Sequence, residues 1–430
     1  MKKVSFYTLG CKVNQYETEV MREMFEAKGY TSVELNENPD VFVINTCSVT
    51  ATSDRKSRRA INKAAKLNPE AIVAVTGCYS QTSPEEVKAL KFADVVIGNA
   101  EKSRIVEIVE RAGKEKYAEV GDIMKTEKYQ PLFASANSGK TRALIKIEDG
   151  CSNFCSYCII PYARGPVRSR SEEDIINEAT TLAQAGYKEI VLTGIHITSY
   201  GLDRGGAELA DLLVKLHGVE GIERIRLGSL ELTPEMIRVA QKADQLPKLC
   251  PHFHISLQSG SDSVLKRMNR RYTSREYFEA AEKLRLAFRD AALTTDIMVG
   301  FPGETDEEFE KSRTFAEKVG FAKVHVFPYS PRKGTVAANM ENQIEEEIKK
   351  VRAAKMQQTA ERLEKEFCRS NIDKTLSVLF ERETAKGVYE GHAENYMVVR
   401  LKNSIDVSGK IVKIIVTGVQ GKTLIGKIAQ

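Results

Sequence analysis

The chain has 430 residues, of which 42% are hydrophobic and 29% charged, and its formal net charge is +5. This is long enough for a buried core in two or three domains, while the small positive charge does not by itself indicate a nucleic-acid partner. No signal peptide is recognisable and no run of about eighteen apolar residues is present, which predicts a cytosolic protein without a membrane span. Eight cysteines in a reducing compartment favour metal binding or catalysis over disulfides.

The first hundred residues alternate short apolar runs with amphipathic stretches, which predicts βαβ units and a parallel sheet. Strands are expected over residues 4–8, 41–44, 72–76 and 95–97. Helices are expected over residues 16–27, 52–66 and 84–90. The first helix would place Val20, Met24 and Ala27 on one face.

Three cysteines follow three successive predicted strands: Cys11, Cys47 and Cys78. Because the carboxyl ends of parallel strands open onto one edge of a sheet, residues that are remote in sequence converge there. We infer that these cysteines hold a [4Fe-4S] cluster with one iron lacking a protein ligand. The alternative is three buried structural cysteines, which are common in protein cores.

Cys151, Cys155 and Cys158 form a Cys-x3-Cys-x2-Cys motif with no fourth cysteine beside it. A [4Fe-4S] cluster on three thiolates leaves one iron open to a small molecule, whereas structural zinc and electron-carrier clusters normally have four protein ligands. The motif therefore predicts an iron–sulfur site that binds a ligand at iron. A zinc knuckle completed by a distant histidine is the alternative.

This spacing resembles the signature of the radical S-adenosylmethionine enzymes. The resemblance implies that the open iron chelates the amino and carboxylate groups of S-adenosylmethionine, whose reductive cleavage supplies a 5′-deoxyadenosyl radical. It also implies that Tyr157, directly before the third cysteine, packs near the adenine.

A second alternating region follows a polar linker at residues 135–140. Strand-like runs cover residues 143–147, 189–192, 224–227, 253–257, 294–298 and 324–327, with helical patterns at 174–185, 235–243, 277–288 and 307–319. This order predicts a partial (β/α)6 barrel. The Cys151 loop follows the first barrel strand, where ligands of such barrels gather.

Other strand ends point to the same mouth of the barrel and carry glycines, hydroxyls or carboxylates. Glycine lets the backbone approach a ligand, and polar side chains suit the ribose and amino group of S-adenosylmethionine. The candidates are Glu231, Gln258, Ser259, Gly260 and Gly300, and an ordinary turn is the alternative for each. His196 and His254 are candidate proton donors or structural histidines.

Two groups of arginines have a geometry that suits phosphates, with internal carboxylate partners as the alternative. They are Arg164, Arg168 and Arg170, and Arg267, Arg270 and Arg271. Cys250 and Cys368 have no matching partners and are expected to be packing residues.

The last part of the chain changes pattern after a long charged helix expected over residues 341–367. Runs at 375–380, 387–390, 397–401, 411–416 and 423–428 predict five short strands that close a small barrel. With residues 389–396, this tail resembles the TRAM domain, an OB-like RNA-binding module. Its nine Lys and Arg from residue 371 onward exceed six Asp and Glu only slightly, but RNA recognition often relies on shape and splayed bases.

The segments around the cysteines, at residues 8–17, 45–50, 76–79 and 150–170, together closely resemble the methylthiotransferases, and the resemblance covers essentially the whole chain. Gly10-Cys-Lys-Val-Asn-Gln-Tyr-Glu17 is similar to the branch that modifies N6-threonylcarbamoyladenosine in tRNA, next to the anticodon. The isopentenyladenosine branch usually reads Cys-Gln-Met-Asn there, and the ribosomal-protein branch Cys-Pro-Lys-Asn.

The resemblance implies two [4Fe-4S] clusters, S-adenosylmethionine, a tRNA anticodon stem-loop as substrate and a reductant protein as electron donor. The auxiliary cluster, on Cys11, Cys47 and Cys78, would hold or deliver sulfur, and the Cys151 cluster would supply the radical that activates C2 of adenosine 37. Modification of ribosomal protein or of isopentenyladenosine in tRNA remains an alternative, as does a non-enzymatic RNA-binding iron–sulfur redox sensor.

The expected architecture is a monomeric α/β protein in the cytosol with three domains. Residues 1–134 would form the methylthiotransferase domain that binds the auxiliary cluster, and residues 135–370 the radical S-adenosylmethionine barrel. Residues 371–430 would form the TRAM domain.

Overall fold

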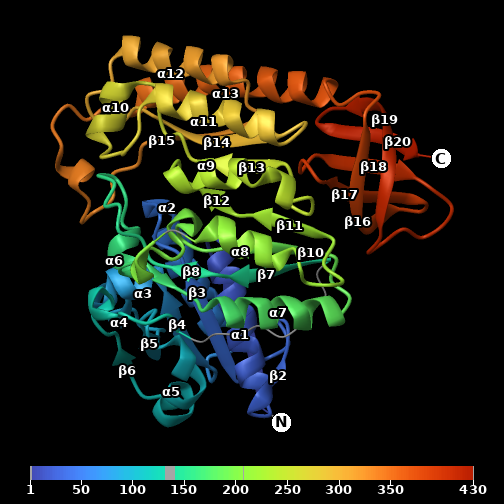
Figure 1. The fold of residues 1–430 in the computed structure, drawn as a ribbon. Helices are drawn as coiled ribbons and strands as arrows, with labels where there is room; N and C mark the ends of the chain where they lie inside the picture. The colour runs from blue at the N-terminus through green and yellow to red at the C-terminus, as the bar shows by residue number, and fades with distance from the viewer. Residues whose placement is uncertain (1, 131–140, 207, 430) are drawn as a thin grey trace.

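The computed structural model describes residues 2–130, 141–206 and 208–429. In chain order, the described residues form a parallel α/β sheet, an open half-barrel and a small closed β-barrel set to one side of the half-barrel (Figure 1). The expected linker at residues 135–140 lies outside the described residues, so the domain boundaries stay predictions. Throughout the described ranges, no helix combines the length and the apolar character that a membrane span requires.

The N-terminal sheet is entirely parallel, with the strand order β2-β1-β3-β4-β5-β6. Its strands are β1 Lys3–Thr8, β2 Thr31–Ser32, β3 Val41–Thr46, β4 Ile72–Gly77, β5 Val95–Ile97 and β6 Tyr117–Glu119. The helices are α1 Lys12–Ala27, α2 Ala51–Leu67, α3 Cys78–Thr82, α4 Pro84–Lys88 and α5 Ile105–Ala112. All four expected strands are present, because continuous apolar runs suit a sheet that is covered on both faces.

Helix α1 differs from its prediction in its first turn and in its buried face. It begins at Lys12, and it buries Val20, Met21 and Phe25, whereas Ala27 is exposed and Met24 only half-buried. The reason is that α1 has two apolar contacts. Met21 and Phe25 pack into the core of their own sheet, while Tyr16 and Val20 pack toward the half-barrel.

The half-barrel consists of two parallel sheets joined at one bent strand. One sheet contains β7 Arg142–Lys146, β10 Glu189–Thr193 and β11 Arg224–Leu227, and the other β12 Ser229–Leu230, β13 His252–Ile255, β14 Ala292–Val299 and β15 Lys323–Pro328. Only Gly228 separates β11 from β12, and its amide donates to the Leu192 carbonyl at 2.8 Å. The two sheets therefore act as one open series of parallel strands, which confirms the partial (β/α)6 barrel.

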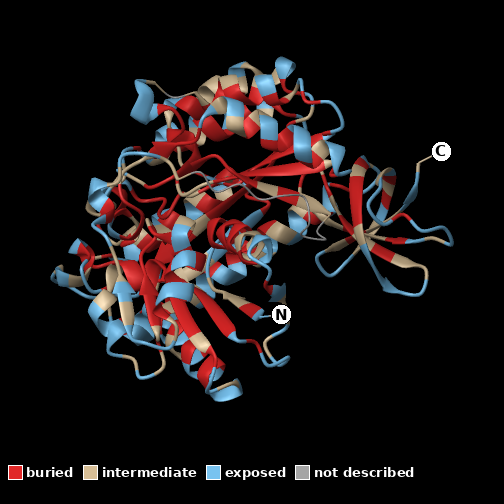
Figure 2. Cartoon of the chain, turned by 90° about the horizontal axis from the view of Figure 1, so that it is seen from below, coloured by how far each residue is buried: buried red, intermediate tan, exposed pale blue. Residues whose placement is uncertain are grey.

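Helices cover the outer face of the half-barrel and bury its largest apolar core. They are α7 Glu172–Gln184, α8 Leu209–Leu216, α9 Pro234–Gln241, α11 Ser274–Ala287 and α12 Asp306–Val319, with the short α6 Ile160–Arg164 and α10 Asp262–Arg267 near the cluster loop. Figure 2 shows the buried residues concentrated in the strands and on the inner sides of the helices. The short strands β8 Glu148–Asp149 and β9 Arg168–Ser169 pair with each other beside the cluster loop.

The long helix α13 Glu346–Arg369 leads into the C-terminal barrel, which closes in the order β16-β17-β18-β20-β19. Its strands are β16 Thr375–Ala385, β17 Val388–Ala393, β18 Val398–Lys402, β19 Ile411–Gln420 and β20 Thr423–Ile428, which confirms the five expected strands. The barrel is fixed to the half-barrel by Arg226 of β11, which donates to the carbonyls of Glu394 at 3.0 Å and Ala393 at 3.2 Å.

Candidate active site

The loop that carries Cys151, Cys155 and Cys158 follows β7 and β8 at the carboxyl end of the half-barrel. Gly150 before it has φ +91°, and a side chain there would collide with the Pro166 carbonyl. The Cys151 amide donates to the Gly165 carbonyl at 3.0 Å, so the loop folds back tightly on the segment after α6. The backbone thus requires glycine at residue 150 to present the three thiols.

The three thiols of this loop lie close enough to affect one another. Burial, followed by the nearby Cys155, raises the pKa of Cys158 to about 12. Burial also raises the pKa of Cys151, and both neighbouring thiols add to the shift. Three convergent thiolate donors fit a [4Fe-4S] cluster that keeps one iron without a protein ligand.

Arg270 supports this loop in a way that its sequence did not reveal. Its buried guanidinium donates to Cys155 Sγ at 3.3 Å and pairs with the Glu231 carboxylate at 3.2 Å. The amide of Asn153 also donates to Glu231, at 3.0 Å. Hydrogen bonds from groups behind the ligands orient them and tune the metal they bind. Arg270 therefore serves an internal carboxylate and a sulfur, which was the alternative to a phosphate contact.

Among the other candidates at the carboxyl end of the half-barrel, Gln258 has a side-chain oxygen without a hydrogen-bond partner in the described residues. This oxygen, Oε1, is buried, and the residue has φ +69°. Tyr157 packs edge-on against Phe301, with ring centroids 6.5 Å apart, in an apolar cluster beside the loop. Contact of either residue with S-adenosylmethionine stays a prediction.

Three further candidates, Ser259, Gly260 and Gly300, lie at strand ends against helices α12 and α13. Ser259 Oγ is hydrogen-bonded to Ser312 Oγ at 2.9 Å, and a Cβ on Gly260 would lie 2.6 Å from Phe315 Cβ, both contacts being with α12. A side chain at Gly300 would collide with Lys349 of α13. The glycines are thus required by close approach of these helices, and a role in cofactor binding remains a prediction for all three.

The candidate histidines have internal partners. His196 Nε2 lies 3.1 Å from Thr198 Oγ1 and 3.7 Å from the Glu231 carboxylate. His254 Nδ1 lies 3.0 Å from Thr294 Oγ1, and its Nε2 lies 3.2 Å from Asp296. These contacts hold both rings in place without a ligand.

The second set of thiols lies at the carboxyl edge of the N-terminal sheet. Cys11 caps α1, Cys47 follows β3, and Cys78 begins α3 directly after β4. Gly10, with φ +103°, lies against Cys47, because an added Cβ would be 3.0 Å from its Sγ. Desolvation by the surrounding protein raises the pKa of both Cys11 and Cys47, and Cys78 adds to both shifts. The sheet therefore brings the three cysteines together.

The donor chemistry of this set, three convergent thiols, suits the same type of cluster as the first set. Across the described ranges, no three cysteine, histidine or carboxylate side chains are placed to ligate one metal ion. In a [4Fe-4S] cluster each thiolate binds a different iron. Cys250 and Cys368 are buried elsewhere, at the half-barrel and under the C-terminal barrel.

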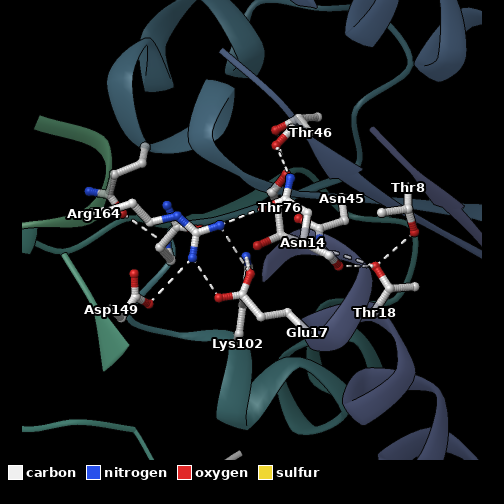
Figure 3. Close-up of polar contacts among 12 residues, drawn as sticks. Thr8, Asn14, Glu17, Thr18, Asn45, Thr46, Thr76, Lys102, Asp149 and Arg164 are labelled. Carbon is white, nitrogen blue, oxygen red and sulfur yellow. Dashed lines mark hydrogen bonds and ion pairs between the residues drawn. The ribbon is translucent and has the colours of Figure 1, made fainter. Parts of the chain in front are cut away.

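A buried ionic network around Glu17 and Arg164 (Figure 3) lies between the segments that carry the two sets of cysteines. Its centre is Glu17 of α1, which pairs with Arg164 at 2.5 Å, with Lys146 at 2.7 Å and also with Lys102. Burial opposes ionisation of Glu17, but Arg164 and the two lysines outweigh it and hold the pKa of Glu17 well below its ordinary value. Arg164 reaches Asp149, 3.3 Å away, on the side of the cluster loop.

The network continues to the auxiliary cysteines through Asn14, whose side-chain oxygen accepts from Arg164. The Asn14 amide donates to the carbonyls of Leu9 at 2.7 Å and Thr46 at 2.9 Å. These carbonyls belong to the residues just before Gly10 and Cys47. One helix turn therefore fixes both the auxiliary cysteine loops and the segment after the Cys151 motif.

The remaining arginines of the first group are also internal. Arg168 donates to the carbonyls of Arg164 at 2.9 Å and Pro166 at 2.8 Å, and Arg170 pairs with Glu178. All three are buried, so the hypothesis that this group binds phosphate is wrong and the internal alternative is correct. In the second group, Arg267 pairs with Glu308 at 2.6 Å, and Arg271 is exposed.

A cavity of about 760 Å³ lies between the half-barrel, the start of α1 and the C-terminal barrel. Lys12, His252, His254, Asp296, His325 and Tyr396 are among its lining residues. The Tyr396 ring lies between His252 and His392, with centroids 4.7 Å from each. Sequence analysis did not select Lys12 or Tyr396, although Lys12 lies within the motif around Cys11.

Comparisons with known proteins agree with this fold. Residues 145–316 match the Radical SAM superfamily, and residues 3–98 match the uncharacterized protein family UPF0004. The solved radical S-adenosylmethionine methyltransferase TsrM from Kitasatospora setae is similar, with a TM-score of 0.55, 15% identity, and coverage of 76% of this chain and 73% of that one. The cobalamin-dependent S-adenosylmethionine radical enzyme OxsB is also similar, with a TM-score of 0.53 and 13% identity. The match covers 85% of this chain and 56% of the OxsB chain. The fold and the Cys151 motif define a radical S-adenosylmethionine enzyme.

Curated relatives narrow this class. Threonylcarbamoyladenosine tRNA methylthiotransferase MtaB from Bacillus subtilis is 43% identical over 96% of this chain and 93% of its own. The protein of the same name from Aquifex aeolicus is 38% identical over 96% of this chain and 100% of its own length. A tRNA-2-methylthio-N(6)-dimethylallyladenosine synthase from Oceanobacillus iheyensis is 36% identical over 100% of this chain and 84% of its own length. The chain belongs to the threonylcarbamoyladenosine tRNA methylthiotransferase family.

Proposed function

We propose that this protein methylthiolates C2 of N6-threonylcarbamoyladenosine at position 37 of tRNA with the help of two [4Fe-4S] clusters. The observation that carries this proposal is the presence of two three-thiol sets joined by the Glu17–Arg164 network. Insertion of sulfur at a carbon needs both a radical source and a sulfur source, and two incompletely ligated clusters meet both needs. The names of the similar relatives support the substrate.

Each set of cysteines has a distinct proposed role. Cys151, Cys155 and Cys158 would hold the cluster that binds S-adenosylmethionine, and Cys11, Cys47 and Cys78 the auxiliary cluster. When bound, these groups supply electron transfer, the radical and the sulfur. Arg270 would balance the negative charge at Cys155, and the free Gln258 Oε1 would accept a hydrogen bond from the cofactor.

Modification of isopentenyladenosine is the second candidate, because a relative named for the dimethylallyl substrate is 36% identical to the whole chain. The threonylcarbamoyl substrate is favoured by the higher identities of 38% and 43% to relatives named for it. Membership of an enzyme family argues against the redox-sensor alternative. The monomeric state, the protein reductant and the cytosolic location stay predictions.

The substrate is tested with anaerobically reconstituted protein, S-adenosylmethionine, a chemical reductant and synthetic anticodon stem-loops. We expect the methylthio product, seen by mass analysis of nucleosides, from the RNA that carries N6-threonylcarbamoyladenosine. Product from the isopentenyladenosine RNA alone would overturn the substrate assignment. In a deletion strain, unchanged levels of methylthio-threonylcarbamoyladenosine in tRNA would do the same.

The separate roles of the two thiol sets are tested with single variants. Cys155→Ala should abolish both cleavage of S-adenosylmethionine and product formation. Cys47→Ala should retain cleavage but lose methylthiolation and about half of the iron and sulfide. Cys250→Ala is the matched control, because this buried cysteine lies outside both sets, and it should keep both activities. Methylthiolation by the Cys47 variant would refute the auxiliary role.

A further inference from the structure

Lys12 lines the cavity between the half-barrel and the C-terminal barrel, and it has no partner among the described residues. It directly follows Cys11, begins α1, and lines the cavity of about 760 Å³ together with His252, His254 and Tyr396. It also lines an adjoining cavity of about 380 Å³ with Arg142 and Arg226. Within the described part of the chain, its ammonium group has neither a hydrogen bond nor an ion pair.

Apart from Lys323, which also lines the larger cavity, the other charged groups around Lys12 have partners among the described residues. Arg142 pairs with Glu381 at 2.6 Å, and Arg226 with Glu189 at 2.8 Å. On the far side of the cavity, Lys422 pairs with Glu364, and Asp296 lies 3.2 Å from His254. Each carboxylate that lines these cavities is therefore already paired with a side chain other than Lys12.

Two of the neighbouring imidazoles, those of His252 and His325, do not change this balance. Burial, then the charge of Arg226, holds the pKa of His252 well below its ordinary value, and burial lowers the pKa of His325. Both rings are thus mainly neutral near pH 7. Helix α1 adds positive potential in the same place, since its first turn contains no acidic residue. Lys12 is therefore left without a negatively charged partner among the described residues that line these cavities.

We propose that Lys12 binds the carboxylate of the threonylcarbamoyl group and thereby selects this substrate; the inference rests on the proposed function. The threonylcarbamoyl group ends in a carboxylate, whereas a dimethylallyl group is apolar. A carboxylate that leaves water for a cavity needs a charged hydrogen-bond partner, and Lys12 is the ammonium beside Cys11 that is available for it.

Rejection of the apolar substrate follows from the same contact. If a dimethylallyl group filled the space, Lys12 would lose contact with water without gaining a partner. Sites built to bond a polar substrate group discriminate strongly against analogues that lack it. Lys12 is therefore a specificity-determining residue rather than a group that takes part in the reaction.

The test compares two stem-loop RNAs that differ only in this carboxylate: one with N6-threonylcarbamoyladenosine, the other with the carboxylate converted to a carboxamide. Equilibrium binding by fluorescence anisotropy, without reductant, gives an acid-to-amide affinity ratio that does not depend on turnover. We expect the unchanged protein to bind the acid RNA at least about tenfold more tightly than the amide RNA, as is typical of a charged hydrogen bond.

Variants of Lys12 then show whether this residue causes the difference in affinity between the acid and the amide RNA. Lys12→Gln should bring the ratio to about one, and Lys12→Arg should keep most of it because the charge remains. Lys323→Gln is the matched control: Lys323 lines the same cavity without a partner in the described residues, but it lies at the start of β15, away from Cys11. It should leave the ratio unchanged. Iron content is measured for each variant, because Lys12 adjoins a proposed cluster ligand.

Two results would overturn the inference. One is an unchanged protein that binds acid and amide equally, a measurement that needs no variant to fold. The other is a Lys12→Gln variant with full iron content and an undiminished ratio. Failure of the proposed function looks different: the acid RNA would then remain unmodified by the reconstituted protein, whatever the affinity ratio.

Discussion

Glu17 accepts hydrogen bonds from both terminal nitrogens of Arg164, at 2.5 and 3.2 Å, although the two residues are 147 positions apart. The pair joins the helix that begins after Cys11 to the helix that follows Cys158. Both side chains are almost completely excluded from solvent. The contact thus fixes the N-terminal sheet against the half-barrel at the point where the two thiol sets approach each other.

Glu17→Gln should be strongly destabilising. The variant keeps the shape of the side chain but leaves the buried cations Arg164, Lys102 and Lys146 with fewer negative partners. Breaking a buried ion pair costs about 3–5 kcal/mol. Anaerobic urea unfolding measures this loss. Glu19→Gln, on the same helix but in a more exposed pair with Arg22, is the control and should cost less than about 1 kcal/mol. Equal losses in the two variants would contradict the role of Glu17.

Gly10→Ala and Gly150→Ala should each remove a different cluster. At Gly10 a Cβ would lie 2.9 Å from Cys47 Cβ, and at Gly150 it would collide with the Pro166 carbonyl. Both residues also have positive φ, at +103° and +91°. We expect Gly10→Ala to lose methylthiolation but retain cleavage of S-adenosylmethionine, and Gly150→Ala to lose both. Iron content and a cleavage assay measure the two outcomes.

Gly186→Ala is the matched control for these substitutions. Gly186 has φ +92°, but a Cβ there would have no atom within 4 Å. The change should therefore cost only backbone strain, about 1–2 kcal/mol, with both clusters retained. Loss of iron in this variant would show that strain alone, rather than the collisions, explains the effects at Gly10 and Gly150.

Glu148→Gln should make stability less dependent on pH. Burial raises the pKa of Glu148 to about 8 even though its carboxylate accepts from the His196 amide at 2.8 Å. A raised acidic pKa means that the folded protein keeps a proton that the unfolded chain releases. The stability due to this group is therefore complete below its unfolded pKa and falls as pH rises to about 8.

The slope expected from this one group is at most about 1.4 kcal/mol per pH unit. Urea unfolding of the variant between the unfolded pKa and pH 8 should show a flatter slope than that of the unchanged protein. The exposed Glu115→Gln serves as the control and should keep the original slope. If Glu148→Gln and Glu115→Gln behave alike, Glu148 does not hold its proton in the folded protein.

Arg226→Met should loosen the C-terminal barrel. Arg226 pairs with Glu189, donates to the carbonyls of Ala393 and Glu394 at the end of β17, and lies over the Tyr396 ring at 4.7 Å. Without these contacts, limited proteolysis should cut the junction between α13 and β16 faster than in the unchanged protein. Arg400→Met is the control, because Arg400 pairs with Glu390 inside the C-terminal barrel itself. Equal cleavage of both variants would argue against this docking role.

Local sequence patterns were sufficient to predict the strands, the half-barrel and the placement of the six cysteines after strands. Alternation of apolar residues and the position of a motif relative to a strand depend on short stretches of chain. The partners of Arg164 and Arg170 could not be found in this way, because Glu17 and Glu178 meet them only after folding. The buried face of α1 was predicted only in part, since Val20 packs toward the half-barrel as Tyr16 does, while Met21 and Phe25 pack into the core of the N-terminal sheet.

The placement of Gly260 and Gly300 illustrates a second limit. Glycine at a strand end is compatible with a bound ligand or with a closely packed helix, and the two explanations look alike in sequence. The structure shows α12 and α13 occupying the space beside these residues. For Arg270 the sequence left a phosphate contact and an internal partner open, and the structure shows its side chain turned inward to Cys155.

The contacts around Glu17 fix the separation of the two thiol sets through side chains that are remote in sequence. Tyr16 reaches Glu178 at 3.1 Å, and Asn99 donates to the Ala163 carbonyl at 2.7 Å, so both sides of the junction are held by noncovalent bonds. The contacts at this junction are therefore of the kind that holds two subunits together, although both sides belong to one polypeptide.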